Sequence, residues 1–213
     1  MNYFDAHTHT FSKEENVLSV VNKFPVSENF SHPFSIGIHP WFIKVKTLNT
    51  EFTVLEEKIQ HKNCLAIGEC GLDKLTEVNF QTQKEVFVTQ IQLSEKYKKP
   101  LIIHCVKAYQ EIIEFKKTLK PKQVWVLHGF NKSLQLAESC LKNGIILSFG
   151  KAIINRNKVV EVFKKLPLNA ILLETDNDDV TIFDVYKKAS EIKNIEVTEL
   201  QKQVEQNFKN IFI

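Results

Sequence analysis

Five short apolar runs in this chain end in side chains that bind metal ions, and this repetition constrains the fold more than any other feature. The first run, Tyr3 to Ala6, leads into His7 and His9, which an extended strand presents on the same side. The other four runs end in Glu69, His104, His128 and Asp176. An isolated His-x-His pair is usually a solvated surface feature, but five runs with the same kind of ending predict a common site.

The spacing of these runs predicts an alternation of strands and helices. Strands are expected near residues 2–6, 17–23, 34–38, 64–68, 100–104, 123–128, 144–149 and 170–175. Most of these runs are continuous rather than alternating, as in parallel strands covered on both faces. Helical patterns are expected at residues 55–60, 80–97, 108–119, 134–142, 158–166, 181–192 and 197–211. About eight strands that alternate with helices predict an α/β fold, a single TIM (β/α)8 barrel over residues 1–213.

The barrel is expected to be trimmed in its early part. Residues 9–17 and 24–33 are too short and too rich in Ser, Asn and Pro for full crossover helices. Near the other end, Asn177, Asp178 and Asp179 are expected to cap the helix that follows Asp176.

The composition excludes several classes of protein. Hydrophobic residues make up 43% and charged residues 25% of the chain, as in an ordinary globular protein. The net charge of +3 is mild, and the basic residues are not gathered into a tail or stripe that would bind nucleic acid. Because Arg156 is the only arginine, phosphate contacts are expected from lysines, backbone N–H groups or metal. No apolar run approaches the ~20 residues of a membrane span, and no signal peptide is evident. We therefore expect a cytoplasmic monomer that does not contact a membrane.

The four cysteines do not contribute to the predicted site. Cys64, Cys70, Cys105 and Cys140 are scattered and lack CxxC spacing, so they are expected to be reduced and mostly buried. Cys70 and Cys105 are neighbours of predicted ligands, but adjacent residues of a strand point to opposite faces.

The predicted ligands indicate a pair of divalent metal ions. Barrel enzymes build their active sites at the carboxyl ends of the strands, where each candidate ligand falls. Imidazoles and carboxylates without thiolates suit ions such as Zn²⁺, Mn²⁺ or Mg²⁺. Four histidines and two acids exceed the needs of one tetrahedral ion, so two ions that share a carboxylate are expected.

Six stretches, taken in their order along the chain, resemble the TatD family of metal-dependent hydrolases over essentially the whole length. The matching stretches are Asp5-Ala6-His7-Thr8-His9, Gly37-Ile38-His39-Pro40, Gly68-Glu69-Cys70-Gly71-Leu72-Asp73, Pro100-Leu101-Ile102-Ile103-His104, His128-Gly129-Phe130 and Glu174-Thr175-Asp176. The resemblance implies a metal-loaded TIM barrel that hydrolyses phosphodiester bonds in DNA.

The resemblance also implies a role for each ligand. One metal would be held by His7, His9, Glu69 and Asp176, and the other by Glu69, His104 and His128, with Glu69 as the bridge. Asp176 ends the last strand, where it can take a proton from the attacking water and return it to the leaving oxygen. The catalytic residues are thus expected to be Asp176, Glu69 and His39. His39 either contacts the phosphate or leaving group, or is a structural residue of the turn before Pro40.

Three departures from the family pattern bear on the substrate. Val106 stands where an arginine is usual, two residues after His104. The small residue, proline and long loop that usually follow Glu-Thr-Asp are replaced by Asn177-Asp178-Asp179 and an early helix, and the early helices are short or missing. The substrate cleft is therefore expected to be open and shallow, and to favour short or single-stranded ends or small phosphodiesters.

Alternatives remain for the reaction and for several residues. A PHP-type phosphoesterase also begins with His-x-His, and an amidohydrolase-like enzyme could use the same metals on an ester or C–N bond. Asp73 is expected either to hydrogen-bond a ligand histidine or to cap a loop. Trp41 and Phe42 are expected either to stack on bases or to pack as apolar residues. Gly68 and Gly71 flank Glu69, where the backbone is expected to approach its neighbours closely.

Overall fold

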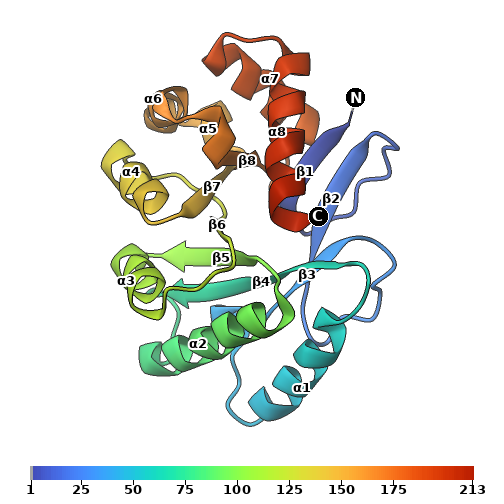
Figure 1. Ribbon diagram of the computed structural model, residues 1–213, viewed down its shortest axis with the longest axis vertical. Coiled ribbons are helices and arrows are strands. Elements are labelled where there is room, and N and C mark those ends of the chain that lie inside the picture. Colours follow the sequence, from blue (N-terminus) through green and yellow to red (C-terminus); the bar gives the residue numbers. More distant parts are fainter. Residues whose placement is uncertain (1) are drawn as a thin grey trace. The chain divides into compact units, whose positions relative to one another are not determined.

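The computed structural model describes residues 2–213, which divide into two compact units (Figure 1). Unit 1 comprises residues 2–21 and 127–213, and unit 2 comprises residues 22–126. The strands are β1 (Tyr3–Thr8), β2 (Val17–Lys23), β3 (Phe34–Ile36), β4 (Cys64–Asp73), β5 (Leu101–Val106), β6 (Trp125–Leu127), β7 (Ile145–Phe149) and β8 (Ile171–Leu173). Each predicted strand is present, so the expected pattern of strands is confirmed. The prediction of one domain over the whole chain stays a prediction.

Most helices lie where they were predicted, but the helix predicted at residues 55–60 begins at Leu48, and the short helix Ala152–Asn155 was not predicted. The helices are α1 (Leu48–Ile59), α2 (Phe80–Tyr97), α3 (Tyr109–Leu119), α4 (Leu134–Lys142), α5 (Ala152–Asn155), α6 (Asn157–Lys165), α7 (Ile182–Lys193) and α8 (Val197–Phe212), with the 3₁₀ turns η1 (Pro40–Phe42) and η2 (Leu168–Ala170). No helix occurs in the described segments 9–16 and 24–33, which confirms the trimmed early part. None of the helices within residues 2–213 is both long and apolar enough for a membrane span.

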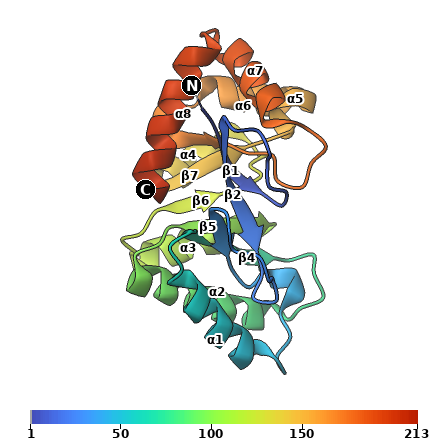
Figure 2. The same cartoon turned by 90° about the vertical axis from the view of Figure 1, so that its right-hand side faces the viewer.

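In unit 1, β1 pairs with β2, β7 pairs with β8, and the end of β1 is joined to the segment that follows β8. Tyr3 of β1 pairs with Val17 of β2, Leu147 of β7 pairs with Ile171 of β8, and a parallel bridge joins Thr8 to Asp176. Helices α7 and α8 pack against β1 (Figure 2). The buried Tyr186 hydroxyl of α7 accepts a hydrogen bond from the Phe4 N–H at 3.1 Å. This packing fixes β1 just before His7.

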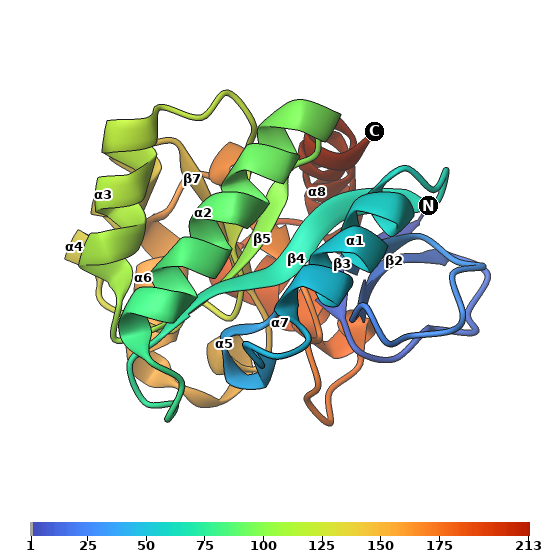
Figure 3. The same cartoon turned by 90° about the horizontal axis from the view of Figure 1, so that it is seen from below.

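In unit 2, the parallel strands β3, β4 and β5 are covered by helices. Phe34 pairs with Cys64 and Ile67 pairs with Leu101, while α2 packs against β4 and α1 against β3 and β4 (Figure 3). Strand β4 continues to Asp73, five residues beyond its predicted end at residue 68. Both Glu69 and Asp73 therefore lie on one strand.

The start of α7 corrects one prediction. The helix is capped by Thr181, whose Oγ1 accepts from the Asp184 N–H at 3.1 Å, while Asp184 Oδ2 accepts from the Thr181 N–H at 3.1 Å. This reciprocal pair satisfies the first free N–H groups of the helix. The expectation that residues 177–179 cap the helix is therefore wrong, because these residues lie in the loop before the cap.

Candidate metal centres

Unit 2 gathers three predicted site residues into one buried cluster. His39 follows β3, Glu69 lies on β4 and His104 on β5. Glu69 Oε1 lies 3.1 Å from His39 Nε2 and 2.9 Å from His104 Nδ1. The exposed fractions of His39, Glu69 and His104 are only 3%, 4% and 8%. A carboxylate between two imidazoles in a buried site is a donor set suited to a divalent ion.

The strand that carries Glu69 packs closely on its neighbour because two glycines flank the acid. A Cβ atom at Gly68 would lie 2.5 Å from the carbonyl oxygen of Ile102, and one at Gly71 would lie 2.1 Å from that of His104. Both glycines also have positive φ angles, 152° and 140°, which L side chains rarely adopt. The predicted close approach around Glu69 is confirmed.

Two buried glutamines of α2 hold the ends of the strands that carry the cluster. Gln90 accepts from the Ile38 N–H at 2.8 Å and donates to the Ile38 carbonyl at 3.1 Å, next to His39. Gln83, seven residues earlier, accepts from the Asp73 N–H at 2.8 Å and donates to the Asp73 carbonyl at 3.0 Å. These amides satisfy backbone groups where the strands end, and they fix the positions of His39 and Asp73.

Asp73 has both of the roles that the sequence left open. Its Oδ2 lies 3.0 Å from His104 Nε2 and accepts from the Trp41 indole N–H at 2.6 Å, while Oδ1 accepts from the Leu75 N–H at 2.7 Å. Burial alone would raise the pKa of Asp73, but the hydrogen bonds from Trp41 and His104 lower it below its usual value. A carboxylate beyond a ligand histidine fixes the tautomer and orientation of the imidazole.

Asn22 of β2 is a further polar contact of Glu69. Its Oδ1 accepts from the Glu69 N–H at 2.9 Å, and its Nδ2 lies 3.5 Å from Glu69 Oε2. Sequence reasoning missed this residue, whose only signal is a buried asparagine near the end of a mostly apolar strand.

Unit 1 gathers the other four predicted ligands. The Nε2 atoms of His7 and His9 each lie 3.5 Å from Asp176 Oδ1, and the rings of His7 and His128 have centroids 4.4 Å apart. His7 is buried, whereas the side chains of His9 and Asp176 are 28% and 35% exposed. This cluster is therefore more open to solvent than the cluster of unit 2.

The backbone around Asp176 is held by β1. The backbone N–H of Asp176 donates to the His7 carbonyl at 2.9 Å, and the Asp176 carbonyl accepts from the His9 N–H at 3.0 Å, so backbone hydrogen bonds join the acid to both histidines. The φ angle of Asp176 is +55°, a left-handed conformation that aspartate tolerates better than most residues. Asp5 braces the same turn by accepting from the Thr175 N–H at 3.0 Å, and burial raises the pKa of its carboxyl to about 7.

A polar cavity of about 280 Å³ in unit 1 extends beside Asp176. Lys151 and Arg156 line it, as does Glu174, a buried acid whose Oε1 accepts from the Gly129 N–H at 2.5 Å. Lys151 also forms an ion pair with Asp178. The single arginine of the chain thus lies on the same cavity as a predicted catalytic acid, and no sequence pattern pointed to this.

The donor sets of both clusters fit divalent metal ions. The candidate ligand atoms of His39, Glu69 and His104 lie within 4.8 Å of one another, and those of His7, His128 and Asp176 satisfy the same limit. Burial raises the pKa of the Cys64 thiol to about 12 and also raises that of Cys70, which keeps these two thiols protonated near neutral pH. The predicted assignment of ligands to two metals, with Glu69 as the bridge, stays a prediction.

Comparison with known proteins identifies the class to which this site belongs. Residues 12–213 match the family model described as TatD related DNase, so the chain belongs to this family. An uncharacterized metal-dependent hydrolase of Haemophilus influenzae is 28% identical over 86% of this chain and 84% of that protein. The human 3'-5' RNA nuclease TATDN2 is 31% identical over 67% of this chain, but the match covers only 19% of that protein. The chain is thus a metal-dependent hydrolase.

A solved structure shows the fold. The crystal structure of YjjV, a TatD homologue from Escherichia coli, matches 99% of this chain and 97% of its own with a TM-score of 0.82 at 21% identity. The expected TIM (β/α)8-barrel fold of the TatD type is therefore confirmed.

Proposed function

We propose that this protein is a two-metal phosphodiesterase that hydrolyses nucleic-acid ends, with DNA as the expected substrate. The observation that carries the proposal is the pair of clusters, each of which combines imidazoles with a carboxylate at the carboxyl ends of parallel strands. Relatives named as nucleases support the choice of a phosphodiester over other hydrolysable bonds. The cytoplasmic location and the monomeric state stay predictions.

The chain's own residues supply binding and proton transfer. Bound divalent ions would stabilise the charge that develops on the phosphoryl oxygens and help to activate water. Asp176 is the proposed proton acceptor, because its carboxylate is about a third exposed, lies beside two histidines and borders the polar cavity. Lys151 and Arg156 line that cavity and supply cationic groups for the backbone of a nucleic acid.

His39 has a supporting part in this scheme. Its Nδ1 accepts from the Trp41 N–H at 3.1 Å, so the imidazole is fixed with Nε2 toward Glu69. Because Nδ1 accepts, the neutral imidazole carries its proton on Nε2, so this N–H donates to Glu69 and could equally donate to a substrate oxygen that takes the place of Glu69. In this proposal the structural and the catalytic interpretations of His39 are compatible.

The proposal is tested by metal reconstitution with parallel substrates. Purified protein is stripped with chelator, reconstituted with Mg²⁺, Mn²⁺ or Zn²⁺, and assayed on a single-stranded oligonucleotide, a p-nitrophenyl phosphodiester, a phosphomonoester and an aminoacyl ester. We expect hydrolysis of the phosphodiesters to disappear on chelation and to return with metal. His32→Ala, on an exposed loop, is the matched control for substitutions of the histidine ligands. Full activity in excess chelator contradicts the two-metal scheme, and cleavage of the ester alone favours the amidohydrolase-like alternative.

A further inference from the structure

We propose that a cavity beside His39 binds one nucleobase of the substrate, an inference that rests on the proposed nuclease function. The cavity has a volume of about 320 Å³ and lies within unit 2. It is lined by the segment 24–26, which follows β2, by residues 37–39 and 42 around η1, and by Lys44 and Glu51. Its lining is mainly apolar, in contrast to the polar cavity of unit 1.

Aromatic side chains form the walls of this cavity. The rings of Phe24 and Phe42 meet edge to face with centroids 5.4 Å apart, and the ring of His39 lies 5.5 Å from that of Phe42. Phe42 is 52% exposed and Val26 is 84% exposed. Apolar surface gathered at a cavity loses contact with water when a flat ligand covers it, and the π-face of a base is such a ligand.

The size and the charges of the cavity favour a single nucleotide unit. Its volume is near the lower end of the ~300–1,000 Å³ of ligand pockets, which suits one base rather than a duplex. Lys44 and Glu51 are the charged lining residues. An ammonium can contact the phosphate, and a carboxylate can accept from the amino or imino groups of a base edge.

His39 connects the cavity to the candidate metal cluster. The same imidazole that lines the cavity has its Nε2 atom 3.1 Å from Glu69 Oε1. A base in the cavity therefore adjoins a phosphodiester at the cluster. Because the base must leave its stack to enter, this arrangement selects unpaired ends over intact duplex.

The test compares two oligonucleotides that differ only in the terminal nucleotide, which carries a base in one and is abasic in the other, with each chain end tested in turn. For the wild type we expect kcat/KM to be on the order of 10-fold higher with the base present, as one aromatic–base stack predicts. Phe42→Ala should reduce this ratio to about 2-fold or less, while Phe42→Trp should retain it. Phe30→Ala is the control, because Phe30 is half-buried in the same unit and packs on Phe34, 4.9 Å away, outside the cavity.

A binding measurement keeps the inference separate from the proposed activity. A terminal 2-aminopurine on an oligonucleotide with an uncleavable methylphosphonate linkage should lose fluorescence on metal-loaded wild-type protein, and much less on Phe42→Ala. A wild-type ratio near one, or a ratio that Phe42→Ala leaves intact, overturns the inference. If the wild type cleaves neither oligonucleotide, the proposed function fails. Quenching that depends on Phe42 then still supports base binding in the cavity, and the absence of such quenching overturns the inference.

Discussion

The two clusters of candidate ligands differ in how firmly the chain holds them. In unit 2, Glu69 lies within 3.1 Å of two imidazoles, and buried amides of α2 brace the strand ends beside them. In unit 1, the two imidazole-to-carboxylate distances to Asp176 are 3.5 Å, and Asp176 is about a third exposed. A buried, braced cluster favours permanent metal binding, whereas an open one favours exchange and proton transfer.

The largest expected effect comes from removing the carboxylate at the centre of the unit 2 cluster. Glu69→Ala should reduce bound metal and lower kcat/KM by at least about 100-fold, because it removes the carboxylate that is predicted to be shared by both metals. His39→Ala should reduce metal content less, since Glu69 and His104 remain. Metal analysis of both purified variants, with circular dichroism as a folding control, checks this order. An equal loss of metal in the two variants would contradict a shared role for Glu69.

The open cluster should respond in a different way. Asp176→Asn should lower kcat by about 100-fold or more, as expected for loss of a general base, with a smaller loss of metal than Glu69→Ala causes. Single-turnover rates measured at saturating metal separate the two effects. If added metal restores the rate of Asp176→Asn, the residue acts only as a ligand, and the contrast between the clusters disappears.

The support of His104 provides a finer test of the braced cluster. Asp73→Asn should weaken metal binding by about 10- to 100-fold, the usual effect of losing a carboxylate behind a ligand histidine. Trp41→Phe keeps the ring but removes the N–H that donates to Asp73 Oδ2 at 2.6 Å, so it should produce a smaller loss in the same direction. Calorimetric titration of metal-free protein measures both. Unchanged affinity in Asp73→Asn would indicate that Asp73 only caps its loop.

Much of this comparison was accessible from the sequence because ligands at strand ends leave a local signal. An apolar run predicts a strand, and the polar residue that ends the run predicts a site residue, which is how His7, His104 and Asp176 became candidates. Helix α1 was only partly predicted, because its first turns contain polar residues such as Asn49 and Glu51. The early part of the barrel was correctly expected to lack helices.

The bracing residues were not accessible in the same way. Gln83 and Gln90 lie on the apolar face of α2. A polar residue on such a face weakens the helical pattern, and the sequence gives no indication of its hydrogen-bond partner. Asn22 contacts Glu69 across 47 residues of sequence, and Arg156 reaches its cavity from the loop between two helices. These contacts join residues that are far apart in the sequence, so no local sequence pattern predicts them.

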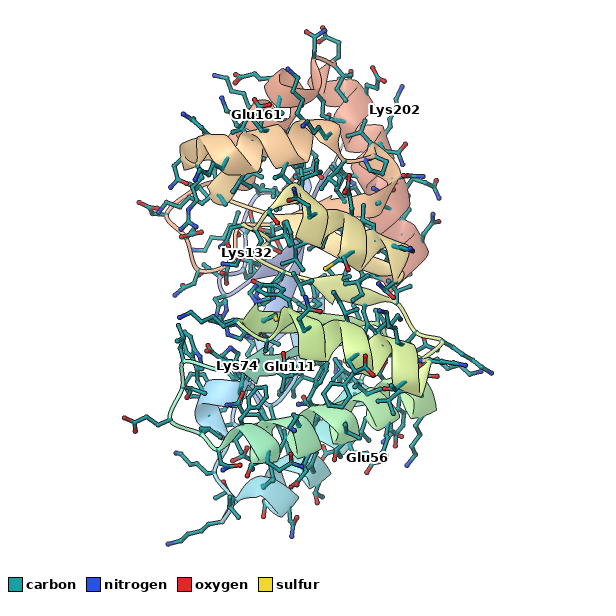
Figure 4. All side chains as sticks on the ribbon, turned by 90° about the vertical axis from the view of Figure 1, so that its left-hand side faces the viewer. Glu56, Lys74, Glu111, Lys132, Glu161 and Lys202 are labelled. Carbon is teal, nitrogen blue, oxygen red and sulfur yellow. The ribbon has the colours of Figure 1, made fainter. Side chains whose placement is uncertain are left out.

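A moderate effect is expected at the groove next to the braced cluster. Val106 lines an open groove of about 610 Å³ together with Trp41, Asp73 and Glu77. The turn that forms one side is tied to α3 by an ion pair between Lys74 and Glu111 (Figure 4). The groove contains acids and no arginine, which agrees with the expectation of a weakly held substrate.

Val106→Arg should lower KM for a DNA end by only about 1.4- to 5-fold, which corresponds to an exposed ion pair of ~0.2–1 kcal/mol, because Asp73 and Glu77 compete for the new guanidinium. Metal content should stay close to that of the wild type, and Val106→Ile is the matched control for side-chain bulk. Steady-state kinetics at several salt concentrations check the effect. Tight cleavage of internal duplex sites by the wild type at high salt would show that the groove already holds its substrate firmly.

The smallest expected effect tests whether the two units unfold together. Lys116 of α3 donates to the Gln123 carbonyl at 3.0 Å and lies over the Trp125 ring, and burial lowers its pKa from 10.5 to about 8. Between pH 8 and pH 10.5 the unfolded chain binds more protons at this site than the folded chain, so stability should rise with pH over this window. The slope should be well below the ~1.36 kcal/mol per pH unit that a difference of one whole bound proton would give, because Lys116 is only partly buried and solvent screens its charge. Lys116→Met should remove the rise. Urea unfolding across this pH range measures the stability of the wild type and the variant. A single transition that loses its pH dependence in the variant shows that unit 1 and unit 2 unfold as one. Two transitions, only one of them affected by the substitution, would show that the braced cluster belongs to a separately stable unit.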